Sequence, residues 1–307
     1  MNQNEPNLGR ILEDWLARVS ADPLYLVRTR SWRRTIEWRV AGEVFRFAAG
    51  PEGIRPEVRS APDDAADIQL ECDAATVREM AAGRLHFFIA LWGLGKVRLR
   101  GSMGDANRLG FLLGRDARAR RIAFVAHCWL NLNTRFPGGG PYPGAQPEVV
   151  KALVESGVGI VQMPCPEQRT FGLEKHTFGD LPAEVVRTRF QEVAEGVVAD
   201  LAEYRGLGFD VVAVIGMDPS PSCGVTMAKG RPAMLGLGDD TSEIPGEGLF
   251  IESLRRVAEA ARVTLPPVVA LRRVLRPEEG EPRGMADLRA VLAKQTPVSQ
   301  VGPGKGN

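Results

Sequence analysis

The sequence lacks the features of a secreted, membrane-spanning or nucleic-acid-binding protein. Four cysteines among 307 residues are too few for a disulfide scaffold. No apolar run approaches the roughly 18–20 residues that span a bilayer. With 39 basic and 38 acidic residues the net charge is +1, without the basic excess that attracts nucleic acid. The first ten residues lack the basic and apolar regions of a secretory signal. We therefore expect a soluble, cytoplasmic protein with no membrane span and no nucleic acid polymer as partner.

The first hundred or so residues have the pattern of a small α+β domain. Apolar and polar residues alternate in several short segments, and Ala41-Gly42 supplies a tight connection between two of them. Strands are predicted over residues 35–40, 44–47, 67–72 and 96–100, and helices over residues 73–83 and 105–113.

This order, with the segment from Asp67 to Ser102, resembles the sterol-carrier-protein-like lipid-transfer domain. The resemblance implies a curved sheet and helices around an apolar tunnel for a lipid-like ligand. Phe87, Phe88, Leu91 and Trp92 are the side chains that could line it. Aromatic residues at helical spacing are more often core residues, and that alternative remains open.

After a charged run at residues 115–121 the pattern changes to alternating buried strands and helices. Strands are expected over residues 122–126, 158–163, 211–215 and 268–271, and helices over 147–157, 183–205 and 247–262. Such alternation predicts an α/β domain with a mainly parallel, Rossmann-like sheet. We place the α+β domain at residues 1–118, the α/β domain at 119–276, and a C-terminal extension at 277–307 with a disordered end.

Three of the four cysteines occupy equivalent positions in the predicted α/β domain. Cys128 follows the first strand, Cys165 the second, and Cys223 the third. Because the carboxyl ends of parallel strands meet at one edge of a sheet, we expect the three thiols to lie close together. Three thiolates suit a soft metal centre, and an iron–sulfur cluster is a common choice. A zinc site completed by His127 is the alternative.

Two motifs sharpen this interpretation. Pro164-Cys165-Pro166-Glu167 and Ser220-Pro221-Ser222-Cys223-Gly224 resemble the thiouracil desulfidase family and its uncharacterised relatives. The resemblance covers residues 121 to about 275. It implies a [4Fe-4S] cluster held by Cys128, Cys165 and Cys223, with Glu167 as the acid/base and Ser220 as a hydroxyl that contacts a small thiolated substrate. The first motif departs from the family pattern, because this chain has His127-Cys128-Trp129-Leu130 there.

Other roles for these residues stay open. Glu167 could cap a helix after Cys165, and Ser220 and Ser222 could form only a turn around Pro221. Arg135, Arg169 and Lys175 could hold a polar substrate, balance the charge of the thiolates or be solvated. At the level of function, the alternative to a desulfidase is a non-enzymatic carrier of an apolar ligand whose second domain holds a redox- or iron-sensing cluster or zinc.

Overall fold

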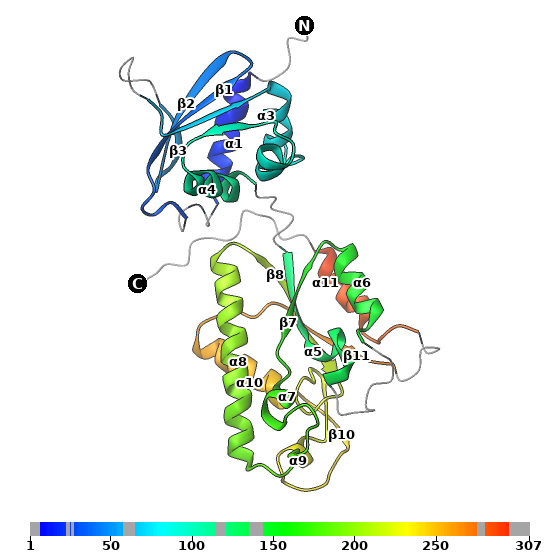
Figure 1. Ribbon diagram of the computed structural model, residues 1–307. Helices are drawn as coiled ribbons and strands as arrows, with labels where there is room; N and C mark the ends of the chain where they lie inside the picture. The colour runs from blue at the N-terminus through cyan, green and yellow to red at the C-terminus, as the bar shows by residue number, and fades with distance from the viewer. Residues whose placement is uncertain are drawn as a thin grey trace. The chain divides into compact units, whose positions relative to one another are not determined.

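The computed structural model describes residues 7–22, 25, 28–57, 65–114, 121–134, 144–274 and 280–294. The chain divides into an N-terminal unit within residues 1–117 and a C-terminal unit within residues 118–302 (Figure 1). Most of the charged run at the expected boundary, Arg135, and the glycine-rich end from Pro297 lie outside the described residues. No helix in the described ranges is long and apolar enough to cross a membrane.

The N-terminal unit is built on one five-stranded sheet of order β3-β2-β1-β4-β5. Its strands are β1 (Arg34–Val40), β2 (Glu43–Gly50), β3 (Gly53–Pro56), β4 (Ile68–Cys72) and β5 (Arg98–Arg100). The expected hairpin is confirmed, with Val40 opposite Glu43 in an antiparallel pair. The pairing of β1 with β4 is parallel, which makes the sheet mixed.

Helices complete the α+β unit. They are α1 (Leu8–Ser20), α3 (Ala74–Ala81), a π-helix (Ile89–Gly93) and α4 (Met103–Leu113). Asp73 caps α3 as expected, because its carboxylate accepts a hydrogen bond from the backbone N–H of Thr76. Helix α1 was not expected from the sequence, and it buries Leu12, Trp15 and Leu16 in the core of the unit.

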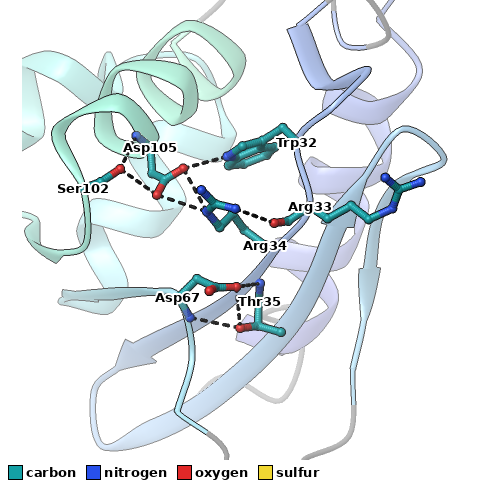
Figure 2. Close-up of polar contacts among 7 residues, drawn as sticks. All are labelled: Trp32, Arg33, Arg34, Thr35, Asp67, Ser102 and Asp105. Carbon is teal, nitrogen blue, oxygen red and sulfur yellow. Dashed lines mark hydrogen bonds and ion pairs between the residues drawn. The ribbon is translucent and has the colours of Figure 1, made fainter.

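A buried polar network joins the start of β1 to α4 (Figure 2). Asp105 accepts hydrogen bonds from Trp32 Nε1 at 2.7 Å and from Arg34 Nε at 3.1 Å. Ser102 caps α4 and also donates its hydroxyl to Asp105 at 2.7 Å. Burial by itself raises the pKa of Asp105, but these hydrogen bonds together outweigh it and lower the pKa. The network therefore holds α4 in a defined position.

The C-terminal unit is an α/β unit, as expected. Its four-stranded sheet has the order β11-β8-β6-β7, and all three pairings are parallel. The strands are β6 (Arg121–Ala126), β7 (Gly159–Met163), β8 (Asp210–Asp218) and β11 (Val268–Arg272), and β9 (Met227–Lys229) with β10 (Glu243–Pro245) forms a separate two-stranded ribbon. The continuous apolar runs follow from burial on both faces of the sheet.

Helices cover this sheet on both faces (Figure 1). One face carries α8 (Ala183–Gly206) and α10 (Leu249–Ala260), and the other carries α6 (Pro147–Glu155) and α11 (Met285–Ala293). The short helices α5 (His127–Leu130), α7 (Pro166–Phe171) and α9 (Arg231–Met234) lie toward the carboxyl ends of the strands. Helix α11 lies in the stretch expected as an extension, and Met285, Leu288 and Leu292 pack into the core of the unit.

Candidate functional site

The three cysteines of the C-terminal unit line one cavity of about 740 Å³ at the carboxyl edge of the sheet. Each comes from the end of a different strand, β6, β7 or β8, and none of them is in a disulfide. The convergence expected from the topology is therefore present in the structure.

Cys128 is held by the short helix α5 directly after β6. The next residue, Trp129, is fully buried, and its indole N–H donates to the carbonyl of Gly216 on β8 at 2.9 Å. The Sγ atom of Cys128 lies 3.3 Å from the sulfur of Met217, which is also on β8. Trp129 thus fixes the turn that brings Cys128 to the cavity.

Cys165 is the N-cap residue of α7, where Pro166 occupies the first helical position. Its sulfur accepts a weak hydrogen bond from the backbone N–H of Gln168 at 3.5 Å. Burial is the main cause that raises the pKa of Cys165, and the negative charge of Glu167 adds to it. Since the sulfur of Cys165 serves as the cap, the capping role considered for Glu167 is not what the structure shows.

Cys223 lies on a loop that Asp218, the last residue of β8, ties in place. Asp218 is buried, and it accepts hydrogen bonds from the backbone N–H groups of Val225 at 2.6 Å and Thr226 at 3.2 Å. A Cβ at Gly224 would lie 2.3 Å from the carbonyl oxygen of Met227, so only glycine fits there. Burial raises the pKa of Cys223 well above its usual value, and the nearby thiolates of Cys128 and Cys165 raise it further.

The start of α10 closes over the same loop. The backbone N–H of Gly248 donates to the carbonyl of Gly224, and that of Phe250 donates to the carbonyl of Ser222, both at 3.0 Å. A Cβ at Gly248 would lie 2.4 Å from the Ser222 carbonyl oxygen. These contacts lock the Cys223 loop against α10.

Glu167 is the centre of a buried polar group beside the cysteines. Its exposed fraction is 8%. One carboxylate oxygen accepts the hydroxyl of Ser222, and the other pairs with the ammonium group of Lys175. All three side chains line the cavity with the cysteines. A carboxylate oxygen can accept more than one hydrogen bond, so Glu167 can still accept one from a ligand or a water.

Ser220 also lines the cavity, but its hydroxyl has structural partners. It accepts hydrogen bonds from the backbone N–H groups of Cys223 at 3.0 Å and Ser222 at 3.3 Å. The two serine hydroxyls lie 3.2 Å apart. The turn-forming role that the sequence left open is thus present, and Ser222 rather than Ser220 contacts Glu167.

His127 borders the three-cysteine cavity and a second cavity of about 490 Å³, which Cys165 also lines. Its Nδ1 lies 2.7 Å from the Gln162 side-chain nitrogen, whereas its Nε2 is buried without a hydrogen-bond partner. Burial lowers the pKa of His127, and the charge of Arg169 adds to this. Among the described residues no group of three or more His, Cys, Asp or Glu side chains is arranged to hold one metal ion, and the zinc site completed by His127 stays a prediction.

Several residues of the cavity were not expected from the sequence. Arg272, Arg273 and Arg283 reach it from the end of β11 and from the segment that pairs with it. Arg272 pairs with Glu243 at 3.0 Å, but the Nη1 of Arg273 is buried without a hydrogen-bond partner. The only sequence signal for Arg273 is its position directly after the fourth parallel strand.

In the N-terminal unit, the residues considered for an apolar tunnel separate into two kinds. Phe87 is fully buried in the core, whereas 53% of Trp92 is exposed. A cavity of about 580 Å³ in this unit is lined by other residues, including Arg39, Glu71 and Lys96. The fourth cysteine, Cys72, is partly buried and accepts a hydrogen bond from Trp38 Nε1 at 3.3 Å.

Comparison with known proteins finds matches over parts of the chain. No protein-family model matches the chain. Among solved structures, the chain is similar to the SCP2L2 protein of Aedes aegypti, a sterol carrier protein 2-like protein, with 19% identity and a TM-score of 0.27 over 34% of this chain and 92% of that one. It is also similar to the sec-alkylsulfatase Pisa1 from Pseudomonas sp., with 21% identity and a TM-score of 0.26 over 34% of this chain and 15% of that one.

A sequence relative is the uncharacterized protein MJ0003 of Methanocaldococcus jannaschii. It is 30% identical over 115 residues, which are 37% of this chain and 73% of the relative. The chain is a two-unit protein with an α+β and an α/β part, and it belongs to the same family as MJ0003. None of these three proteins is described as a desulfidase, so the resemblance to that family remains a prediction.

Proposed function

We propose that the C-terminal unit binds an iron–sulfur cluster through Cys128, Cys165 and Cys223 and removes sulfur from a small thiocarbonyl compound. The observation that carries this proposal is that three thiols from three strand ends reach one cavity beside a buried Glu167. Ligand sites of open parallel sheets lie at this edge.

The donor set and the space fit a cluster better than a single ion. Three thiols are the soft ligands that iron–sulfur clusters take. Together they line a cavity of about 740 Å³, which leaves room for a group larger than an ion. A [4Fe-4S] cluster takes thiolate ligands on separate irons, which suits three thiols that come from three strand ends.

The chain's own residues would bind substrate and move protons. With three protein ligands, a bound cubane would keep one iron open as a Lewis acid for the soft sulfur of a thiocarbonyl group. Ser222 and Lys175 hold the two oxygens of Glu167, so its carboxylate has a fixed position from which it takes a proton from water. The overall reaction exchanges C=S for C=O, consumes water and releases hydrogen sulfide, and no electrons are transferred.

Metal analysis tests the cofactor. Protein prepared without oxygen should contain iron and acid-labile sulfide in equal amounts and absorb visible light. Cys165→Ser should lose this iron, because a hydroxyl is a poor ligand for such a cluster. Cys72→Ser, in the other unit, is the matched control and should keep it. Zinc in place of iron, or equal loss of iron in both variants, would contradict the assignment.

Sulfide release tests the reaction. The full chain incubated with a thiolated pyrimidine base should release sulfide and the oxo base. Glu167→Gln should keep the cluster but slow release by about 10²–10⁴-fold, the usual contribution of an acid–base group. Glu155→Gln, on the exposed end of α6, should behave like the wild type. A cluster-loaded wild type that releases no sulfide from any thiolated base would leave the cofactor assignment standing and overturn the enzymatic one.

A second candidate is a non-enzymatic carrier of an apolar ligand in the N-terminal unit. One of the similar solved structures is described as palmitated SCP2L2, and this makes palmitate a suitable probe. The observation in the molecule itself is a group of apolar side chains open to solvent on this unit. Binding of labelled palmitate in about one copy per chain, retained in Cys165→Ser, would support it; absence of binding would contradict it.

A further inference from the structure

Large apolar side chains gather on the surface of the N-terminal unit, at the π-helix and α4. We call Phe88, Ile89, Trp92, Leu94 and Phe111 the apolar cluster. Four of them are 47–56% exposed, and the fifth, Phe88, stacks on Trp92 at 4.7 Å between ring centroids and meets Phe111 edge-on at 5.6 Å. A contiguous exposed patch of this kind marks an interaction surface more often than isolated apolar residues do.

Positive charge borders the apolar cluster. The guanidinium of Arg28 lies 4.3 Å from the centroid of Phe111, and that of Arg108, nearly one turn before Phe111 on α4, lies 5.6 Å from the centroid of Trp32. Residues 84–114 contain five basic residues and one acid, Asp105, which is buried and paired with Arg34. Residues 25–34 add four arginines and no acid. These two segments are strongly basic in a chain whose net charge is only +1.

The fold holds this surface in place. A Cβ at Gly110 would lie 1.9 Å from the ring of Phe88, so glycine at this position lets the two elements pack together. Asp105 fixes α4 through Trp32, Arg34 and Ser102, which all bond to its carboxylate (Figure 2). The apolar cluster is therefore presented by rigid elements.

We propose that this surface docks on lipid membranes that carry negative charge. Trp92, Ile89 and Leu94 would enter the boundary between headgroups and acyl chains, while Arg28 and Arg108 would face anionic headgroups. Single-stranded nucleic acid would also stack on the rings, but the exposed aliphatic Ile89 and Leu94 gain more from hydrocarbon than from a polyanion. The proposal depends on neither function proposed above.

Vesicle sedimentation tests the proposal with the full chain. The protein should pellet with vesicles of equal parts phosphatidylcholine and phosphatidylserine, pellet much less with phosphatidylcholine alone, and dissociate as salt is added. Arg28→Gln and Arg108→Gln should each weaken binding roughly fivefold. Trp92→Glu and Leu94→Glu should nearly abolish it, because a charge placed at the acyl boundary opposes insertion.

Matched controls lie on the same unit. Val44 is 57% exposed in β2, and Arg55 is exposed on β3, so Val44→Glu and Arg55→Gln should bind like the wild type. Circular dichroism shows whether each variant is folded, and Trp92→Phe should remove most of the fluorescence shift that vesicles cause. Absence of pelleting with either vesicle, equal pelleting with both, or equal loss in the controls would overturn the proposal. Binding to single-stranded RNA without binding to vesicles would overturn it as well.

Discussion

Both units bury charged or ionisable side chains, but they surround them differently. In the N-terminal unit Asp105 meets only donors, and their hydrogen bonds lower its pKa despite burial. In the C-terminal unit burial raises the pKa values of Cys165 and Cys223, and the carboxylate of Glu167 raises both further. The thiols of Cys128 and Cys165 add to the rise at Cys223, whereas the charge of Lys175 opposes the rise at Cys165. The first arrangement favours the ionised form of Asp105, whereas the second favours the neutral form of the two thiols.

This difference separates a structural network from a candidate site. A polar group that gains hydrogen bonds on folding contributes to stability, as Asp105 does. A thiol whose pKa is raised by burial and by like-charged neighbours stays neutral at neutral pH, and groups with perturbed pKa values concentrate at functional sites. The contrast supports assigning the chemistry to the strand ends of the C-terminal unit, and variants can test each side of it.

The largest effect is expected at Gly224, where the Cys223 loop is packed most tightly. A methyl group there would lie 2.3 Å from the Met227 carbonyl oxygen and 2.7 Å from that of Ser220. Gly224→Ala should destabilise the C-terminal unit by about 3 kcal/mol, because backbone must move. Gly196→Ala is the matched control, since nothing lies within 4 Å of its Cβ, and on α8 it should stabilise by ~0.5–1 kcal/mol.

Calorimetry and metal analysis of the same samples check the Gly224 prediction. Displacement of the loop should also reduce bound iron, because Cys223 belongs to it. Equal stability and iron content in Gly224→Ala and Gly196→Ala would show that the loop tolerates movement and would remove the argument for a rigid site.

A smaller loss is expected at Asp105. Asp105→Asn removes the ion pair with Arg34 and the charge that strengthens the hydrogen bonds from Trp32 and Ser102. The N-terminal unit should lose ~1–2 kcal/mol at neutral pH. Asp14→Asn, on the exposed side of α1, should cost almost nothing. Four of the five tryptophans lie in this unit, so denaturation followed by tryptophan fluorescence reports mainly its unfolding.

The lowered pKa of Asp105 predicts how its contribution to stability changes with pH. The folded-state pKa of Asp105 is lowered, so the unfolded chain binds the proton more readily. The stabilisation is therefore present above the usual aspartate pKa of about 4 and is lost as the pH falls from there through the folded-state pKa. The difference between wild type and Asp105→Asn should shrink over that range. A difference that is constant with pH would mean that the carboxylate acts by packing alone.

The sequence predicts the C-terminal unit better than the N-terminal one for a physical reason. Buried parallel strands are continuous apolar runs, and topology alone sends their carboxyl ends to one edge, so Cys128, Cys165 and Cys223 could be placed together. Glu167 was found by its motif. The sequence did not identify Lys175 as the ion-pair partner of Glu167, because Lys175 lies in the irregular segment between α7 and α8, which has no periodicity.

The N-terminal unit shows what local pattern leaves undetermined. Helix α1 has a readable signal, Leu12, Trp15 and Leu16 at helical spacing after the cap residue Asn7, which our prediction did not use. The parallel pairing of β1 with β4 and the Asp105 network join residues more than 30 and 70 positions apart. No short-range pattern specifies such contacts, since they depend on how whole elements pack.

The smallest effect on stability is expected at Arg273 of the candidate site, which can be compared with the buried Arg46 of the N-terminal unit. Arg46 has carboxylates of Glu37 and Glu57 at 3.7 and 3.9 Å, and the partly buried Arg273 has its Nη1 atom buried without a hydrogen-bond partner. An unpaired buried donor is a cost to folding, so Arg273→Met should leave stability within about 0.5 kcal/mol or raise it slightly. If the donor is kept for substrate, the same variant should raise the KM for the thiolated compound with little change in kcat. Steady-state sulfide release measures both constants, and an unchanged KM together with higher stability would show that Arg273 does not contact substrate.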